Sequence, residues 1–203
     1  LITYTLELCQ KIDVLDVFVS TDDEDIAKYC EDYGITTSYR RPEQLASDDA
    51  SMFDTVIHGI NWYQSFNNCN LESVILLQPT APLRNQSEVN SAINHFIDEA
   101  LESLVSVTRM YEHPFECIEM TSEVNWKYLR SSGKQNVARQ QYTGRFGYID
   151  GSFYISSNKF LKKYQSFVIE NLTVPYFLEN RYSLDIDEFE DLSLAEALLK
   201  IRK

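Results

Sequence analysis

Several features that would assign a function quickly are missing from this sequence. No apolar run approaches the roughly 20 residues that a helix needs to cross a bilayer, so the 203 residues contain no predicted transmembrane helix. Basic residues are outnumbered, 18 against 31 acidic ones, and the net charge is −13. Because binding to a nucleic-acid backbone depends on clustered lysine and arginine, we expect neither a nucleic-acid nor a membrane partner.

Cysteine is also scarce, and no CxxC pair occurs. The chain has four cysteines, which lie far apart: Cys9, Cys30, Cys69 and Cys117. This spacing favours free thiols over a disulfide framework or a zinc site, and free thiols are typical of a reducing compartment. We therefore expect a cytoplasmic protein.

The common catalytic and nucleotide-binding motifs are absent as well. Neither GxGxxG nor GxxxxGK[ST] is present, and no Ser-His-Asp or Cys-His arrangement can be argued. His58 and His95 fall on predicted helices, where a structural role is the simpler interpretation.

Helical and extended segments alternate through residues 1–110. Amphipathic periodicity predicts four helices, at about residues 2–12, 21–34, 51–66 and 87–99. Short apolar runs predict four strands, at residues 16–20, 36–40, 73–78 and 103–109. This order is typical of a parallel sheet covered on both faces by helices. We predict an α/β fold, a three-layer α/β/α Rossmann-like core with a mainly parallel sheet.

The alternation stops after Tyr111. Residues 111–148 lack a helical period and are rich in Tyr, Arg, Ser and Asn, so we interpret them as an inserted arm. The core resumes over residues 149–203. There the pattern predicts strands at 151–156 and 173–178, a helix at 158–164 and a terminal amphipathic helix.

Polar residues follow the predicted strand at 73–78. In an open α/β sheet, ligands bind outside the carboxyl ends of the strands. Here two prolines stiffen a turn that carries Gln78, Thr80 and Arg84, and a rigid turn suits a ligand that is recognised by hydrogen bonds. An ordinary strand-to-helix turn, with Arg84 paired to a nearby acid, explains the same residues equally well.

A pair of carboxylates near the carboxyl end is a candidate metal site. Asp185 and Asp187 are separated by one residue, so both point to the same side of an extended segment. Paired carboxylate oxygens suit Mg²⁺ bound to the phosphates of a nucleotide. Alternatively, Asp187 and Glu190 form a capping box for the last helix and Asp185 is a solvated turn residue.

Two further loops carry candidate ligand-binding residues. Arg41 follows the predicted strand at 36–40, and its planar guanidinium suits a base or a phosphate. Ala50 and Ser51 place a small backbone surface beside a helix start, where a flat ring fits. A surface loop that ends in a helix N-cap accounts for this stretch too.

Six segments, taken in order, resemble the CMP-sialic acid synthetase (acylneuraminate cytidylyltransferase) family. They are VFVSTDDEDIA, RPEQLASDDAS, VILLQPTAPLR, ARQQY, GYIDGSFYI and SLDIDEFEDLSLAEALL. The resemblance runs along almost the whole chain and implies a nucleotidyltransferase fold. It also implies an enzyme that joins CTP to a nine-carbon 2-keto-3-deoxy sugar acid, releases pyrophosphate and uses Mg²⁺.

The same resemblance implies roles for particular residues. The catalytic, Mg²⁺-binding carboxylates are Asp185 and Asp187, and the nucleotide site contains Arg41, Ala50 and Ser51. The residues implied for the sugar acid are Gln78, Thr80, Arg139, Gln140 and Asp150. Residues 111–148 correspond to a dimerisation arm, so we expect a homodimer in which Arg139 reaches the neighbouring subunit's site.

The sequence departs from the family pattern in three places, of which the smallest is RQQ (residues 139–141) in place of the usual RQD. The family opens with a strand and a basic, glycine-rich loop of the type ARGGSK, and this chain begins after it; we expect the intact protein to carry that loop. Asp150 stands where sialic acid enzymes commonly have Asn, which favours a legionaminic- or pseudaminic-type sugar.

Two alternatives to this function are open. One is a Kdo-activating or other nucleotidyltransferase of this fold, and the other is a non-catalytic binding module if the loop is absent.

Overall fold

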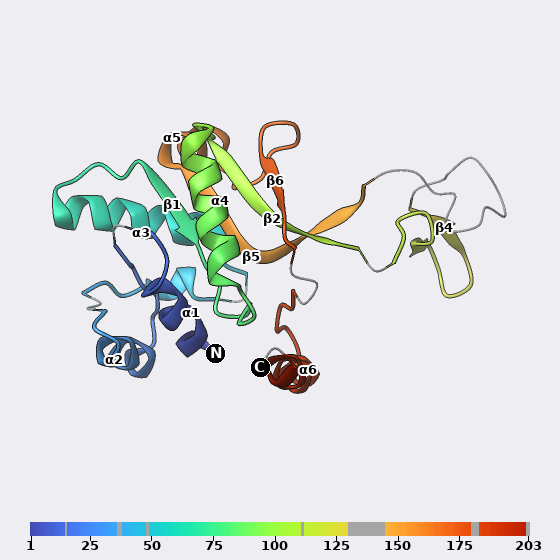
Figure 1. Ribbon diagram of the computed structural model, residues 1–203, viewed down its shortest axis with the longest axis horizontal. Helices are drawn as coiled ribbons and strands as arrows, with labels where there is room; N and C mark the ends of the chain where they lie inside the picture. The colour runs from blue at the N-terminus through green and yellow to red at the C-terminus, as the bar shows by residue number, and fades with distance from the viewer. Residues whose placement is uncertain are drawn as a thin grey trace.

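A four-stranded sheet forms the centre of the computed structural model, which describes residues 1–14, 16–35, 38–47, 49–110, 112–129, 145–179 and 183–201. Its strand order is β1-β5-β2-β6 (Figure 1). The strands are β1 (Ser73–Leu76), β5 (Gly147–Ser157), β2 (Ser103–Arg109) and β6 (Val174–Phe177). The predicted strands at 73–78, 103–109, 151–156 and 173–178 are therefore confirmed as elements.

The sheet is mixed. β2 and β6 are parallel, whereas β5 is antiparallel to both β1 and β2. Three of the four strands, β1, β2 and β6, therefore run in one direction, as the α/β prediction requires. β5 reverses because the chain leaves the sheet at the end of β2, passes through the arm and returns directly alongside that strand.

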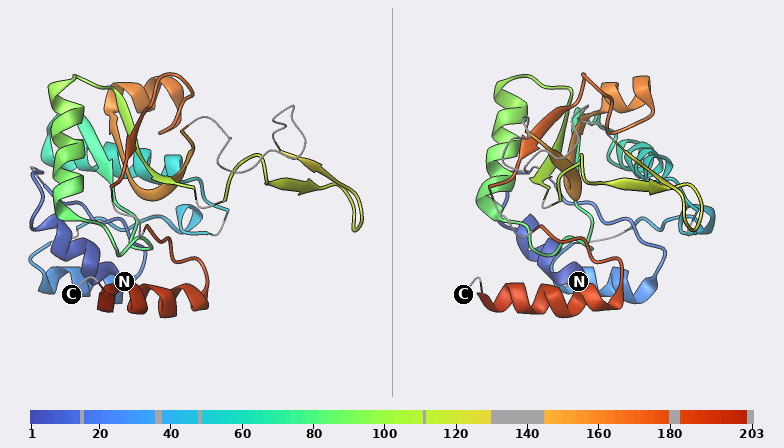
Figure 2. Two further views of the ribbon diagram at one scale, coloured as in Figure 1. Left: turned by 45° about the vertical axis from the view of Figure 1, so that its right-hand side comes forward. Right: turned by 90° about the vertical axis from the view of Figure 1, so that its right-hand side faces the viewer.

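Helices cover both faces of this sheet, which confirms the three-layer prediction (Figure 2). On one face, α1 (Ile2–Cys9) and α4 (Gln86–Asp98) pack on β2 and β5 through the larger apolar cluster. On the other face, α3 (Met52–Asn67) and α5 (Asn158–Tyr164) contribute Ile60 and Leu161 to a second cluster. These two apolar layers fix β5 from both sides, and β5 carries part of the candidate site.

Two predicted strands are wrong. The described residues of 16–20 and 36–40 form no strand. Their apolar side chains pack against α3 instead: the ring of Phe18 lies 5.0 Å from that of Tyr39 and 5.8 Å from that of Trp62. This packing buries Tyr39 but leaves Phe18 partly exposed, and here it takes the place of a strand ladder. His58 joins the cluster, donating to or accepting from the Tyr39 hydroxyl at 2.9 Å, as its structural interpretation predicted.

The remaining helices begin and end close to their predicted limits. α2 (Glu24–Asp32) is capped by Asp23, whose carboxylate accepts from two backbone N–H groups. A short 3-10 turn, η1 (Glu43–Leu45), follows, and α6 (Phe189–Ile201) ends the chain. Among the described residues, every helix is too short or too polar to cross a bilayer. All four cysteines are free thiols, as predicted.

The described part of the arm forms a hairpin that projects away from the sheet (Figures 1 and 2). Its strands are β3 (Ile118–Met120) and β4 (Trp126–Tyr128), and they pair antiparallel with Ile118 opposite Tyr128. Many of its apolar side chains are exposed, Trp126 by 51% and Leu129 by 63%. A two-stranded hairpin cannot bury these side chains by itself. An exposed apolar surface of this kind marks a site of interaction with another surface.

Candidate functional site

An irregularity in β5 shapes the site. Val105 of β2 pairs with Tyr154, but Val107 pairs with Ile149, so β5 has extra residues opposite Ser106. Such bulges re-aim side chains away from the regular ladder. The Ser106 side chain stabilises this one, because its hydroxyl donates to Oδ1 of Asp150, with the Phe153 carbonyl as an alternative acceptor at 3.1 Å, and accepts from the Phe153 amide at 3.0 Å.

The bulge brings three separate motifs together at Gly151. This residue has a left-handed φ of +72°, and a Cβ placed on it would lie 2.9 Å from Oδ2 of Asp185 and 3.6 Å from Oε1 of Gln78. Gln78 follows β1, Gly151 lies within β5 and Asp185 precedes α6. The structure therefore unites the candidate sugar-binding glutamine with the candidate metal-binding aspartate, as expected for groups beyond the carboxyl end of a strand.

Backbone contacts hold the segment that carries the two aspartates. The Ile186 amide donates to the Thr80 carbonyl at 2.9 Å, and the Ile186 side chain is buried. Asp185, just before it, is half-buried and Asp187, just after it, is exposed. Thr80 thus contributes its backbone carbonyl here, and a ligand contact by its hydroxyl stays a prediction.

Another aspartate reaches back from α6. Oδ2 of Asp191 accepts from the amides of Asp187 at 3.0 Å and Glu188 at 2.9 Å. In the capping box that we considered as an alternative, Glu190 would supply this carboxylate. The Asp187 carboxylate is exposed to solvent and has no hydrogen bond to any described residue, so it is open to a role other than that box.

The Asp185 carboxylate has an unusual environment. Its Oδ1 is buried and has no hydrogen-bond partner among the described residues. A buried polar atom left unpaired costs free energy, so the site favours a cation or donor that would approach this oxygen. Within the described residues there is no cluster of three or more His, Cys, Asp or Glu that could hold a metal. Mg²⁺ commonly takes only one or two carboxylates together with water and phosphate oxygens, so the pair Asp185 and Asp187 fits it.

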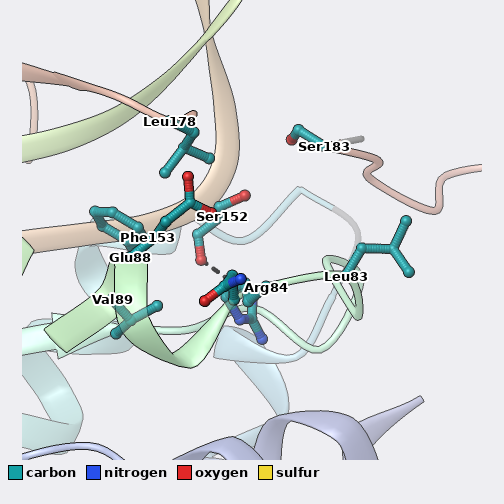
Figure 3. A pocket seen from close by; sticks show the side chains of 9 residues that line it. Leu83, Arg84, Glu88, Val89, Ser152, Phe153, Leu178 and Ser183 are labelled. Carbon is teal, nitrogen blue, oxygen red and sulfur yellow. Dashed lines mark hydrogen bonds between the residues drawn. The ribbon is translucent and has the colours of Figure 1, made fainter. Parts of the chain in front are cut away.

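Arg84 holds the backbone beside the site, and Figure 3 shows its guanidinium next to Ser152. Its Nη1 donates to the carbonyls of Gln78 at 2.7 Å and Ser152 at 3.1 Å, and its Nη2 donates to Oγ1 of Thr5 at 2.6 Å. Burial lowers the pKa of Arg84 to about 10, against the opposing effect of nearby acidic groups that include Asp185. The cation therefore joins β1, β5 and α1 and is structural. The cavity beside it, about 10 Å³, is no larger than a water molecule requires.

Asp150 is buried within a set of donors. Its Oδ1 accepts from the hydroxyl of Ser106 and, at 3.2 Å, from the amide of Ser152. Its Oδ2 accepts from the hydroxyls of Ser152, at 2.9 Å, and Ser183. The sequence-based expectation of a sugar contact by Asp150 stays a prediction, and the structure shows which protein groups already occupy this carboxylate.

The predicted nucleotide-binding residues lie on neighbouring loops. Nε of Arg41 donates to Oγ of Ser20 at 3.1 Å, and its Nη2 donates to the Ser20 carbonyl. Ser51 is the N-cap of α3, accepting from the Asp54 amide at 3.3 Å, as the N-cap interpretation predicted. The amide of Ala50 donates to the carbonyl of Ser47 at 2.9 Å.

No described contact tests the ligand roles of Arg41, Ala50 and Ser51. Arg139 and Gln140 lie outside the described residues.

Sequence reasoning missed the three serines around Asp150. One signal was available, because Ser106 lies between two valines of a buried strand, where its hydroxyl requires a hydrogen-bond partner. Ser183 gave no comparable signal, since serine is common in polar loops and indicates no particular contact there. Only the fold places it beside a residue 33 positions earlier.

Comparison with known proteins decides the family. No family model matches the chain. It is 30% identical over 190 residues to the CMP-N,N'-diacetyllegionaminic acid synthase of Legionella pneumophila, covering 93% of this chain and 79% of that protein. The chain belongs to the CMP-sialic acid synthetase family. Membership of that family confirms the resemblance that the six sequence segments indicated.

A second family member is longer than this chain. The N-acylneuraminate cytidylyltransferase of Escherichia coli O18:K1:H7 is 27% identical over 202 residues, which cover 96% of this chain and 45% of that protein. The chain thus spans about half the length of this relative.

A solved structure supports the fold. A CMP:2-keto-3-deoxy-manno-octonic acid synthetase complexed with CTP superposes with a TM-score of 0.66, covering 100% of this chain and 88% of that one. At 13% identity, the likeness shows the fold alone.

Proposed function

We propose that the protein is a cytidylyltransferase that transfers CMP from CTP to a nine-carbon 2-keto-3-deoxy sugar acid and releases pyrophosphate. Membership of the CMP-sialic acid synthetase family supports this reaction, since the two relatives are named for sialic and legionaminic acids. The observation that carries the proposal is the meeting of Gln78, Gly151 and Asp185 from three distant segments. A polar amide, a closely approachable backbone and an unpaired carboxylate oxygen are suited to an anionic sugar and a metal-bound nucleotide.

The proposed chemistry depends on positioning and electrostatics rather than on a covalent intermediate with the protein. The anomeric hydroxyl of the sugar acid attacks the α-phosphorus of CTP, and pyrophosphate leaves. Asp185 and Asp187 would hold Mg²⁺, which offsets charge on the phosphates when it is bound. Gln78 offers one acceptor and two donor hydrogens, so its amide can orient a sugar hydroxyl or carboxylate.

The rigid surroundings of Gln78 support its proposed role. Arg84 ties the Gln78 carbonyl to the strand β5 through Ser152, and the Ala81 amide donates to the same carbonyl at 3.2 Å. A side chain on a backbone fixed in this way loses little further entropy when a ligand binds. Thr80, Arg41, Ala50 and Ser51 complete the proposed site.

Substrate specificity tests the proposal. In the intact protein, we expect pyrophosphate release with CTP and a nine-carbon acid, either N-acetylneuraminic or diacetyllegionaminic. We expect kcat/KM at least about 100-fold lower with UTP, ATP or Kdo, because a site built on hydrogen bonds penalises unpaired groups strongly. Faster release with Kdo or UTP would assign the protein to another branch of this fold. CTP binding without any release would favour a binding module.

We also infer a homodimer built through the arm, together with a cytoplasmic location suited to four free thiols. The hairpin exposes six large apolar side chains: Ile118, Met120, Val124, Trp126, Tyr128 and Leu129. Exposed apolar patches of this kind mark interaction surfaces. A second copy is a fitting partner, because self-association through a projecting hairpin would cover the patch on both subunits and would bring Arg139 towards the neighbouring site.

Light scattering checks this assembly. Wild-type protein at micromolar concentration should have twice the 23.6 kDa mass of one chain. The double variant Trp126→Lys/Tyr128→Lys should be monomeric, since a charge cannot be buried unpaired in an apolar interface. Ile97→Lys is the matched control: Ile97 is 63% exposed on α4, outside the arm, and its replacement should leave the dimer intact. A monomeric wild type would contradict both the dimer and the role of Arg139.

A further inference from the structure

The buried carboxylate of Asp150 joins three parts of the fold. Only 4% of the residue is exposed, and an ionised carboxylate is stable in such a place only when it is hydrogen-bonded. Its partners come from different elements: Ser106 lies on β2, Ser152 on β5, and Ser183 in the segment that leads to α6. Among the described residues, both carboxylate oxygens are occupied by these donors.

The bond to Ser183 is one of two anchors that flank Asp185. On one side, the Ser183 hydroxyl donates to Oδ2 of Asp150. On the other, the Ile186 amide donates to the Thr80 carbonyl at 2.9 Å. Between them, Oδ2 of Asp185 approaches within 2.9 Å of where a Cβ on Gly151 would lie, while its Oδ1 is buried and has no partner in the described part of the chain. An unpaired buried oxygen is costly, so the surrounding contacts must hold it in place.

We propose that Asp150 is a positioning residue: through Ser183 it fixes the segment 183–186 so that the unpaired oxygen of Asp185 faces the ligand site. The carboxylate of Asp150 acts on the protein and does not itself contact the sugar acid. This inference deepens the proposed function, because it rests on the metal-binding role of Asp185. It also means that the acid at position 150 sets metal affinity rather than the choice of sugar.

Two serine variants separate this role from ordinary stabilisation. Ser183→Ala and Ser106→Ala each remove one hydroxyl donor to Asp150, but only the first cuts the link to the Asp185 segment. In native-state hydrogen exchange, Ser183→Ala should speed exchange of the Ile186 amide by about tenfold relative to the amides of β2, as expected for loss of one hydrogen bond to a charged group. In Ser106→Ala, any increase in the exchange rate of the Ile186 amide should be matched by a similar increase for the amides of β2.

Metal binding provides the second measurement. Titration with Mn²⁺, followed by electron paramagnetic resonance, should show affinity about tenfold weaker in Ser183→Ala and within about twofold of wild type in Ser106→Ala. Ser183→Thr keeps a hydroxyl and should restore both the Ile186 exchange rate and the affinity. In Asp150→Asn, Mn²⁺ affinity should fall while the ratio of kcat/KM between two nine-carbon acids stays unchanged.

The outcomes distinguish the inference from the function beneath it. If the Ile186 exchange rate, taken relative to the β2 amides, were the same in the two serine variants, the positioning role would be overturned. This holds for any measured Mn²⁺ affinity. A changed ratio between sugar acids in Asp150→Asn would overturn it too, by showing that Asp150 contacts the sugar. If wild-type protein bound no Mn²⁺, the proposed metal site would fail, and the exchange comparison would still decide whether Asp150 holds the segment.

Discussion

Turnover of CTP should fall by about a thousandfold or more when Asp185 is replaced by alanine, the loss expected when a group that balances phosphate charge is removed. The same substitution should leave the fold intact. Because Oδ1 of Asp185 is buried without a partner among the residues that the structure describes, its removal eliminates a desolvation cost, and the melting temperature of the metal-free protein should stay constant or rise. Pyrophosphate release and thermal unfolding, measured on one preparation, check both halves of this prediction.

The neighbouring acid Glu188 provides a control for this experiment. Glu188 is exposed, lies three residues further along, and contributes its amide rather than its side chain to the bond with Asp191. Glu188→Ala should therefore change turnover by less than about twofold, as for most surface substitutions. Full activity in Asp185→Ala would contradict the metal assignment. Lost activity accompanied by a lower melting temperature would show instead that Asp185 stabilises the fold.

Much of the fold could be predicted because its strongest signals are local. The helical period marks α3 and α4 to within a residue or two, and the apolar run at 103–109 coincides with β2. The segment at 16–20 shows the limit of such signals. Its apolar residues are half-buried (Val17 and Val19) or exposed (Phe18), so the burial that a core strand implies is not found. In a short run, packing against a helix and pairing in a sheet look alike. The direction of β5 also depends on the arm, which local pattern does not describe.

Individual residues of the candidate site could be predicted from the sequence, but the contacts between them could not. Gln78 and Asp185 could be picked out because polar groups after strands and paired carboxylates have recognisable chemistry. Their proximity depends on the bulge opposite Ser106, where β5 departs from regular pairing with β2. A bulge of this kind leaves little trace in a single sequence. The sequence signalled that Ser106 needs a hydrogen-bond partner, but only the fold shows that this partner is Asp150 and that Ser183 shares it.

The left-handed backbone at Gly151 leads to the second large expected effect. Gly151→Ala should lower CTP turnover by about 100-fold, because the added methyl would lie 2.9 Å from Oδ2 of Asp185 and would displace that carboxylate. The substitution should also reduce the free energy of unfolding by roughly 1–2 kcal/mol, since alanine disfavours a positive φ. Pyrophosphate release, Mn²⁺ affinity and denaturant unfolding report these effects separately.

Gly34 is a matched control for the backbone part of this effect. Its φ of +77° is close to the +72° of Gly151, but a Cβ on Gly34 would meet nothing within 4 Å. Gly34→Ala should therefore lose a similar free energy of unfolding, again roughly 1–2 kcal/mol, and keep wild-type turnover and Mn²⁺ affinity. If the two variants lost activity to the same extent, general destabilisation would explain the result. A selective loss in Gly151→Ala would instead establish that close approach of Asp185 to β5 is what the reaction requires.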